Sequence, residues 1–451
     1  MTLTTLLLRI TLAALVLTGI TYFGFKKKDN LLLSLLQNFC GALFLFSGYV
    51  KAVDPLGTAY KMEQYFAEFE ATFADTALSF LAPLFPLMSE WSVGFSVFMI
   101  VLEIVLGLAL ILGARPKLTA WLFFGIVLFF TVLTGFTYTT GYVPSGTNYF
   151  AFGQWGPYLE TNMRVTDCGC FGDFLKLEPF QSFLKDIALL FPAVIFLLAQ
   201  KKMHQLFSEK VRNLTLGGLA VVTLLYCLSN YAWDIPGQDF RPFKVNTDVA
   251  AVKQAEADAA ANVTTLAYVL TNKATGEVRE IETNEFLKVM GDYPQDAWEY
   301  DTKVSEPAIE PTKISDFELS DVTGDDPVVG LLEDPGYTFL VVAYKLKGEA
   351  GAWDEGYLEK WTENVQPVVK AAQAAGHKVA AMTKFNDEAT LADFKAQVGA
   401  DYPFWRGDDI MLKTIIRSNP GVVLMKDGVI LGKYHHRKLP TFEELKSQFP
   451  L

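Results

Sequence analysis

The sequence contains few cysteines and few histidines, and this scarcity excludes several classes of protein. Of the 451 residues, four are cysteine and four are histidine. Four cysteines are too few for a fold built on disulfides, and four histidines leave little material for a histidine metal site. The acidic half of the chain also lacks the runs of lysine and arginine that binding to nucleic acid phosphates requires. We therefore expect no disulfide scaffold, no metal site and no nucleic acid partner.

Hydropathy and charge divide the chain into two parts. The sequence is 51% hydrophobic and has a mean hydropathy of +0.24, which is high for a soluble protein of this length. Residues 1–234 hold 15 basic and 15 acidic residues, so the whole net charge of −12 lies in the remainder. These numbers predict an apolar membrane part followed by an acidic soluble part.

Six stretches approach or reach the roughly 20 apolar residues that a membrane span requires. They are Leu3–Phe25, Leu31–Val50, Ser92–Gly113, Leu118–Phe136, Asp186–Leu198 with its flanks, and Leu214–Trp233. The loops after the first, third and fifth stretches carry lysine and arginine, which assigns them to the cytoplasm by the positive-inside rule. Both termini then lie in the periplasm of a bacterial inner membrane. The first stretch could instead be a signal peptide, but its lysines, Lys26 to Lys28, follow the apolar run rather than precede it.

After residue 234 the pattern becomes that of a soluble protein. Residues 235–311 are expected to form a periplasmic connector that contains a β-hairpin around Asn272–Gly276. Residues 312–451 alternate in the order strand, helix, strand, helix, helix, strand, strand, helix. A βαβ unit, a helix, a hairpin and a closing helix follow one another in this order in thioredoxin, so we predict an α/β thioredoxin-like domain.

The loop before the fifth span contains two cysteines separated by one glycine, Cys168 and Cys170. A disulfide between them needs a tight turn and would be strained and easily reduced, which favours thiol-disulfide exchange. A disulfide that only pins the loop is the structural alternative, and metal binding or free thiols remain open. The carboxylate oxygens of Asp167 and Asp173 are hard ligands, so they are poor additional ligands for a metal that prefers thiolates. These acids are also expected to raise the thiol pKa values unless a cation lies nearby.

Glu103 lies in the middle of the third span, where a carboxylate is costly and therefore a candidate for function. Lys51, Asp54, Lys185 and Asp186 stand at the periplasmic ends of other spans and are its expected partners. A structural ion pair or a protonated glutamate is as well supported as a role in proton handling.

The two other cysteines, Cys40 and Cys227, fall inside predicted spans, where cysteine is usually a small apolar filler. A relay from the loop thiols through these residues to a quinone is the alternative. It is disfavoured because Cys40 lies near mid-membrane and Cys227 nearer the periplasmic end.

Three segments of the membrane part, Phe46–Lys61, Leu102–Gly107 and Asp167–Asp173, resemble the DoxX family and, within it, MauE-type membrane proteins. The resemblance covers residues 31–200 as a four-helix membrane core, with residues 1–30 and 201–234 as additional spans. It implies a fold related to quinone-linked disulfide-forming membrane proteins, with Cys168 and Cys170 as the redox pair. MauE itself is associated with maturation of a disulfide-rich periplasmic dehydrogenase.

The C-terminal part is similar to a fusion found in one DoxX subgroup, through Ile235–Phe243 and Leu412–Gly421. Within it, Ser315–Gly324 resembles the opening hairpin of TlpA-like thioredoxin folds. The resemblance implies a cis peptide bond at Asn419–Pro420 and a partner-binding loop formed by Asn419, Pro420 and Gly421.

The catalytic Cys-X-X-Cys of such domains is missing, because its expected position, 347–355, holds no cysteine. No cysteine follows Cys227, so this domain cannot exchange disulfides itself.

These sequence features support two candidate functions for the whole chain. The favoured one is a non-enzymatic membrane scaffold that presents a redox-inactive domain to a periplasmic partner. The alternative is a membrane thiol-disulfide factor that acts through Cys168 and Cys170.

Overall fold

The structure, a computed structural model, describes the whole chain except residues 1, 28–29, 166 and 306. Lys28, one of the lysines assigned to the cytoplasm, therefore lies outside the described residues. The chain divides into a membrane unit, Met1–Phe240, and a C-terminal unit, Arg241–Leu451.

The described part of the membrane unit contains six helical segments long and apolar enough to cross a bilayer, as predicted. They are Leu3–Gly24, Leu31–Val53, Ser92–Leu112, Pro116–Thr140, Pro179–Lys202 and Glu209–Trp233. The fifth segment begins seven residues before the predicted Asp186, because Pro179 occupies the first turn, where a missing amide hydrogen costs nothing. By length and composition, the chain is a multi-pass membrane protein.

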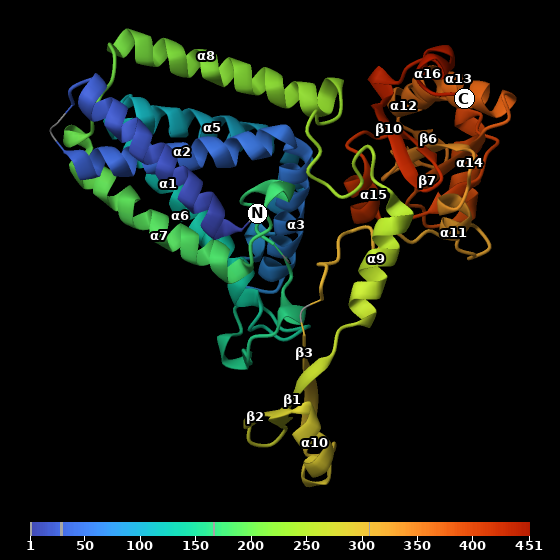
Figure 1. Cartoon of the computed structure of the whole chain (residues 1–451), viewed down its shortest axis with the longest axis horizontal. Helices are drawn as coiled ribbons and strands as arrows, with labels where there is room; N and C mark the ends of the chain where they lie inside the picture. The colour runs from blue at the N-terminus through green and yellow to red at the C-terminus, as the bar shows by residue number, and fades with distance from the viewer. Residues whose placement is uncertain (1, 28–29, 166, 306) are drawn as a thin grey trace. The chain divides into compact units, whose positions relative to one another are not determined.

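The helices of the membrane unit pack in pairs (Figure 1). Their bounds are α1 Leu3–Gly19, α2 Leu31–Val53, α3 Pro55–Ala74, α4 Leu84–Glu90, α5 Ser92–Leu112, α6 Pro116–Thr140, α7 Pro179–Ala199 and α8 Glu209–Leu228. Helix α2 packs on α5 and on α1, α6 packs on α7, and α8 packs along α5. Large apolar side chains on the outer faces, such as Phe23 and Leu198, remain exposed, as lipid-facing residues do.

Helix α3 covers one end of the bundle (Figure 1). Asp54 begins the helix by accepting a hydrogen bond from the Gly57 amide at 3.0 Å. On its inner face, Phe69 lies against Phe136 of α6, with the ring centroids 5.0 Å apart. These contacts attach α3 to the bundle.

The contact between α2 and α5 depends on two glycines. A Cβ atom at Gly107 would lie 2.8 Å from the Gly41 carbonyl oxygen, and one at Gly41 would lie 2.6 Å from the Gly107 carbonyl oxygen. Backbones approach this closely in membrane bundles only where small residues face each other.

We expect Gly107→Leu to lower the free energy of unfolding by at least about 2 kcal/mol, because the added side chain meets backbone that cannot move aside. Gly125→Leu on α6 is the control, since a Cβ at Gly125 has no heavy atom within 4 Å among the described residues. Unfolding of both variants in mixed micelles of SDS and a mild detergent measures the difference. Equal stability of the two variants would contradict this packing.

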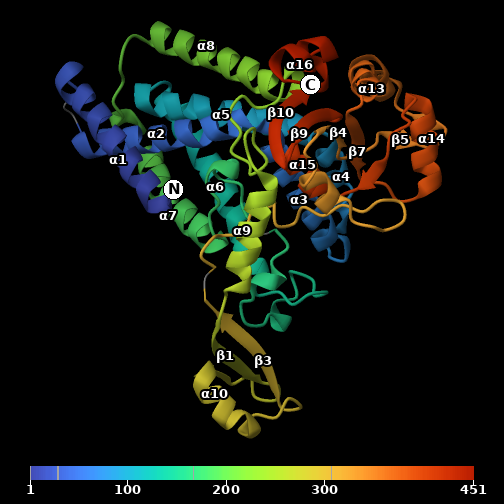
Figure 2. The same ribbon diagram turned by 45° about the vertical axis from the view of Figure 1, so that its right-hand side comes forward.

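The C-terminal unit contains a five-stranded mixed sheet in the order β10-β9-β4-β7-β8 (Figure 2). The strands are β4 Tyr337–Ala343, β7 Lys378–Thr383, β8 Phe404–Arg406, β9 Gly421–Lys426 and β10 Val429–His435. Strands β4, β7 and β8 run parallel, whereas β9 is antiparallel to both β4 and β10. A two-stranded ribbon, β5 Gly348–Glu349 and β6 Ala352–Trp353, follows β4.

Helices and loops cover both faces of this sheet, so the central strand β4 is buried along its whole length. The helices are α9 Val249–Ala261, α11 Val328–Leu332, α12 Glu355–Glu359, α13 Gln366–Ala374, α14 Glu388–Val398, α15 Asp409–Ile415 and α16 Phe442–Gln448. One face, with Phe339 and Val341, packs against α12, α13, α14 and α16. The other, with Leu340 and Met425, lines a small cavity that Ile415 of α15 and Val249 of α9 close.

Two predicted elements of this unit require correction. The helix predicted after the first strand is not continuous: a π-helical segment, Lys360–Val365, interrupts it, because Pro367 offers no amide hydrogen for the regular ladder. The expected hairpin at Ser315–Gly324 is reduced to one β-bridge between Ser320 and Arg406. Asp321 accepts hydrogen bonds from three backbone and side-chain groups of the following turn, and these bonds replace the strand pairing.

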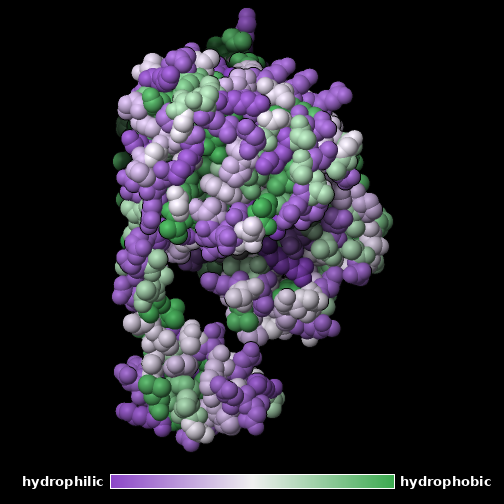
Figure 3. Space-filling view, turned by 90° about the vertical axis from the view of Figure 1, so that its right-hand side faces the viewer, coloured by the Kyte–Doolittle hydropathy of each residue, from purple (hydrophilic) through white to green (hydrophobic). Residues whose placement is uncertain are grey.

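A smaller three-stranded antiparallel sheet lies earlier in this unit (Figure 2). It consists of β1 Thr265–Asn272, β2 Val278–Glu282 and β3 Trp298–Val304, with helix α10 Thr283–Val289 packed on β1. The β1–β2 pair is the predicted hairpin. Hydrophilic side chains cover much of the face of the C-terminal unit that Figure 3 shows, and hydrophobic ones form small separate areas.

Candidate functional site

The two loop cysteines lie in a compact turn that glycine makes possible. Gly169 has a φ of +61° and Gly172 a φ of +51°, both in the left-handed region. The Asp167 side chain accepts a hydrogen bond from the Gly169 amide at 3.0 Å and fixes the start of the turn. Cys168 and Cys170 are free thiols, each partly buried.

Polar side chains from three helices surround the Cys168 thiol. Tyr65 of α3, Thr137 of α6 and Ser182 of α7 are all buried and act on it. The Tyr65 hydroxyl and the Thr137 hydroxyl are 2.6 Å apart. Burial, with a smaller contribution from the neighbouring Cys170, raises the pKa of Cys168 to about 12. Cys168 is therefore protonated at neutral pH.

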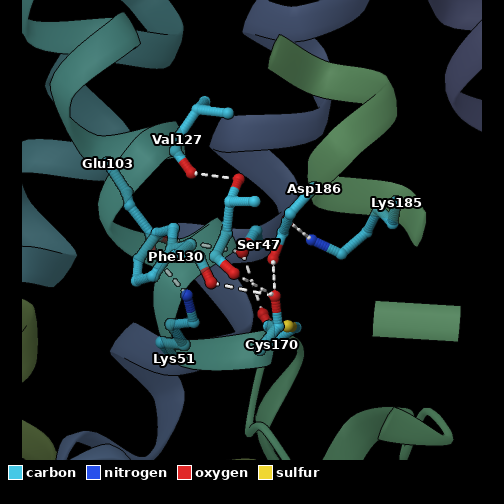
Figure 4. Close-up of polar contacts among 10 residues, drawn as sticks. Ser47, Lys51, Glu103, Val127, Phe130, Cys170, Lys185 and Asp186 are labelled. Carbon is cyan, nitrogen blue, oxygen red and sulfur yellow. Dashed lines mark hydrogen bonds and ion pairs between the residues drawn. The ribbon is translucent and has the colours of Figure 1, made fainter. Parts of the chain in front are cut away.

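Cys170 lies beside charged side chains of the membrane helices (Figure 4). Its carbonyl oxygen accepts a hydrogen bond from the Ser47 hydroxyl at 3.0 Å, which ties the loop to α2. Burial raises the pKa of the Cys170 thiol; Lys185 lowers it, Asp186 raises it and Lys51 lowers it, and the net shift is upward. The two thiols thus differ, because only Cys170 has cations that stabilise its thiolate.

Lys51 and Glu103 form a buried ion pair next to Cys170. The Lys51 Nζ atom lies 2.5 Å from Glu103 Oε1, and the residues are 6% and 1% exposed. Ser47 also contacts Glu103, at 3.2 Å, and Lys51 Nζ lies 4.9 Å from the centre of the Phe130 ring. Of the predicted partners of Glu103, the structure places Lys51 in contact, whereas Asp54 caps helix α3.

A second buried pair, Lys185 and Asp186, stands on α7 on the other side of Cys170. Asp186 is 1% exposed and also accepts a hydrogen bond from the Thr134 hydroxyl of α6 at 3.1 Å. Lys51, Lys185 and Asp186 therefore act on the Cys170 thiol, and Glu103 is linked to the Cys170 carbonyl through Ser47. A buried charge costs several kcal/mol unless it is paired, and charged residues are rare inside membrane helices. Four charged side chains at one place in the bundle therefore indicate a functional site.

The acids next to the cysteines affect the thiols less than the sequence predicts. Asp167 forms an ion pair with Lys61 at 3.1 Å, and this nearby cation offsets its charge. Asp173 lies in the following 3-10 turn, Gly172–Phe174. The expected rise of the thiol pKa values is present, but its largest cause is burial in the bundle end rather than these carboxylates.

We expect alkylation of Cys168 by iodoacetamide at pH 8 to be about 1,000-fold slower than that of an exposed cysteine, because three pKa units reduce the thiolate fraction by this factor. The rate should rise with pH until it approaches 12. In the folded chain the Cys168 thiol keeps its proton up to a pH of about 12, whereas in the unfolded chain it releases the proton near pH 9. The contribution of this thiol to the free energy of unfolding is therefore present below pH 9 and is lost as the pH rises from 9 towards 12. A plateau of the rate near pH 9 would contradict the assignment.

Cys40 and Cys227 do not join this site. Cys40 is buried in the apolar cluster formed by α1, α2, α5, α6 and α7, and Cys227 in a separate cluster with Ile100 and Ile104 of α5. This placement agrees with their interpretation as small apolar fillers. Beside Cys170, Phe46 packs against Phe171 with the ring centroids 6.1 Å apart, and Phe171 is 1% exposed, while Lys185 is paired with Asp186.

The predicted partner-binding loop of the C-terminal unit is buried. The Asn419–Pro420 peptide bond is cis, as predicted. The Asn419 amide nitrogen donates to the Lys345 carbonyl at 2.7 Å, and Tyr357 donates to the Asn419 side-chain oxygen at 3.3 Å. Pro420 and Gly421 are also buried.

Sequence reasoning missed most of the uncharged groups around the thiols. Ser47, Thr134, Thr137, Ser182 and Tyr65 were not predicted. A signal was present, because three of the spans that line the site carry polar residues three or four positions apart, which share one helix face. The pairs are Ser47 with Lys51, Thr134 with Thr137, and Ser182 with Asp186.

Comparison of the chain with family models, with curated proteins and with solved structures found no match.

Proposed function

We propose that the chain is a membrane thiol-disulfide factor in which Cys168 and Cys170 exchange a disulfide with a protein client. One observation carries the proposal: two buried ion pairs from three helices converge on a thiol in a short glycine turn. A disulfide that only pinned a loop would need no charged groups around it. The resemblance to MauE-type proteins supports the same function.

The proposed reaction is a reversible exchange that balances without a further reagent. The Cys170 thiol releases its proton to water, and the thiolate, favoured by Lys185 and Lys51, attacks one sulfur of a client disulfide. A mixed disulfide forms and one client thiolate leaves. Cys168 then loses its proton and displaces the second client thiolate, which leaves a Cys168–Cys170 disulfide and a reduced client. In reverse, the same steps place a disulfide in the client.

Titration of the purified full chain against glutathione buffers tests this proposal. We expect one two-electron transition in which two thiols, alkylated after the chain has been acid-quenched and unfolded, become resistant to alkylation, and peptide mapping should assign both to Cys168 and Cys170. Thiols that remain reactive in every buffer would refute the exchange function.

The C-terminal unit has a second proposed role, as a domain that holds the partner. We infer a thioredoxin-like fold from the parallel β4–β7 pair joined through α12 and α13, the antiparallel β9–β10 hairpin and the closing helix α16. The absence of cysteine after Cys227 favours binding over catalysis for this unit. The burial of Asn419, Pro420 and Gly421 gives a scaffold function alone less support than exchange.

Exchange with a periplasmic client requires the thiols to face an oxidising compartment. We expect reporter fusions after Lys28, Lys117 and Lys202 to report the cytoplasm and a fusion at Leu451 to report the periplasm, because basic loops stay inside. Paired fusions to alkaline phosphatase and to a fluorescent protein measure on which side of the membrane each of these positions lies. A cytoplasmic C-terminus would contradict both the topology and the compartment.

A further inference from the structure

The loops that precede α6 and α8 contact each other at one end of the membrane unit. The Leu206 amide, in the loop before α8, donates to the carbonyl of Leu112 at the end of α5 at 2.9 Å. Beside this contact, the Arg115 Nε atom donates to the side-chain oxygen of Asn213 at 3.1 Å. The starts of two membrane-spanning helices are therefore joined at this end of the unit.

Asn213 holds the Arg115 side chain through a single nitrogen. Arg115 is exposed, and its two terminal nitrogens, Nη1 and Nη2, make no hydrogen bond or ion pair with any described residue. A guanidinium group that is held through Nε keeps its planar pair of terminal nitrogens available. This pair matches the spacing of two oxygens of a phosphate or carboxylate group.

The residue before Asn213, Arg212, is a buried cation without an anionic partner. Arg212 is 7% exposed, and its Nη1 atom donates to the carbonyls of Leu206 and Phe207 at 3.2 Å and 3.0 Å. Its Nη2 atom donates to the Gln205 side-chain oxygen at 2.8 Å, and Nε has no partner in the described part of the chain. All these acceptors are neutral. A buried charge without a counter-charge costs several kcal/mol, which favours an anion at this end of the bundle.

Two exposed lysines add to the positive charge here. Lys117 stands in the first turn of α6, and Lys210 stands in the first turn of α8. Glu209 is the one acid within residues 113–118 and 203–213, so these segments carry a net charge of +3. Neither lysine and neither arginine forms an ion pair with another described residue.

Apolar side chains next to the lysines place this charge at the headgroup level of a bilayer. Trp121 follows Lys117 by four residues and is 56% exposed, and Leu214 follows Lys210 by four residues and is 75% exposed. Residues four apart share a helix face, so each lysine stands beside an apolar side chain that faces lipid. Tryptophan is enriched at this level. An anion that carries acyl chains gains from these apolar side chains, whereas a free anion does not.

We propose that Arg115, held by Asn213, binds the phosphate group of an anionic phospholipid. Its two terminal nitrogens donate to two phosphate oxygens. The charges of Lys117, Lys210 and Arg212 strengthen this binding, and the acyl chains lie along the lipid-facing sides of α6 and α8.

This lipid site is separate from the thiol pair. Thr137, which acts on the Cys168 thiol, follows Lys117 by 20 residues on the same helix α6. Twenty residues of α-helix span about 30 Å. The lipid site therefore stands or falls independently of disulfide exchange.

Native mass spectrometry of the full chain in detergent, with a short-chain phosphatidylglycerol as the probe, tests this site. We expect saturable binding that is at least about tenfold tighter than that of phosphatidylcholine with the same chains, whose choline cation the basic residues repel. Arg115→Gln should weaken phosphatidylglycerol binding at least about tenfold. Arg115→Lys, which keeps the charge but loses the paired nitrogens, should weaken it at least about threefold.

Two further variants complete this experiment. Lys117→Gln combined with Lys210→Gln changes exposed positions only and should weaken binding at least about tenfold, because each cation near the headgroups contributes to it. Lys176→Gln is the control, since this exposed lysine lies in the loop of the thiols, and its charge is screened at the distance of the lipid site. It should bind phosphatidylglycerol as the native chain does.

Inorganic phosphate and glycerol phosphate distinguish a lipid from a free phosphate. We expect neither to displace phosphatidylglycerol at an equal concentration, because they lack acyl chains. Displacement by inorganic phosphate at that concentration would assign the site to a free phosphate and overturn the lipid. Equal binding of phosphatidylglycerol and phosphatidylcholine, or equal binding by Arg115→Gln and Lys176→Gln, would overturn the site itself.

Discussion

Replacing Lys51 with methionine while Glu103 remains is expected to lower the free energy of unfolding by about 3–5 kcal/mol. The change leaves Glu103, which is 1% exposed, as a buried charge without its cation. Lys61→Met is the matched control, because its partner Asp167 is partly exposed and the pair contributes at most about 1 kcal/mol. Unfolding in mixed micelles compares the two variants with the native chain.

The double variant Lys51→Met with Glu103→Leu separates a structural role of this pair from a functional one. Removing both charges should return the stability to within about 1 kcal/mol of the native value, since apolar residues of similar size replace buried pairs well. If Lys51 favours the Cys170 thiolate, the same variant should exchange disulfides at least about tenfold more slowly. Native exchange rates in the double variant would show that the pair is only structural.

Substitution of either loop cysteine by serine is expected to reduce exchange with glutathione disulfide at least about 100-fold, because a lone thiol cannot complete the second displacement. Cys170→Ser removes the thiol next to the cations. Cys168→Ser keeps the Cys170 thiol, which can still form a mixed disulfide, but no second thiol is present to displace the bound partner. Alkylation of samples quenched at successive times measures the rate of exchange, and mass spectrometry identifies the mixed disulfide with glutathione.

Cys227→Ala is the control for this experiment, since Cys227 lies in an apolar cluster away from the loop thiols. It should exchange within about twofold of the native rate. Loss of exchange in Cys227→Ala comparable to that in the loop variants would show that the relay through the span cysteines had been wrongly dismissed.

Much of the fold could be predicted from local patterns. The six apolar runs, the β1–β2 hairpin and the order of strands and helices after residue 337 are each encoded within short windows. Strand β8, Phe404–Arg406, has only three residues and is held by pairing with β7, so its own sequence carries almost no signal. Strand β3 alternates between aromatic and charged residues, a signal that sequence reasoning overlooked.

The sequence predicted the two loop cysteines of the site and its charged residues inside the membrane helices, but few of its other residues. Glu103, Lys51, Lys185 and Asp186 stand out because charges are rare inside membrane helices. The distances between them depend on how three helices pack, which local sequence does not specify. The state of Cys168 illustrates this limit, because burial by α3, α6 and α7, not the adjacent acids, dominates its pKa.

Thiol trapping in native membranes tests exchange at Cys168 and Cys170 most directly. The full chain carrying Cys168→Ser is purified by affinity after rapid alkylation, next to the native chain and to the double variant with Cys170→Ser. Exchange predicts that Cys168→Ser accumulates a mixed disulfide through Cys170 with a protein client, and that the double variant accumulates none. If no adduct forms, and both single variants support normal growth and complex assembly, the cysteines are not an exchange pair.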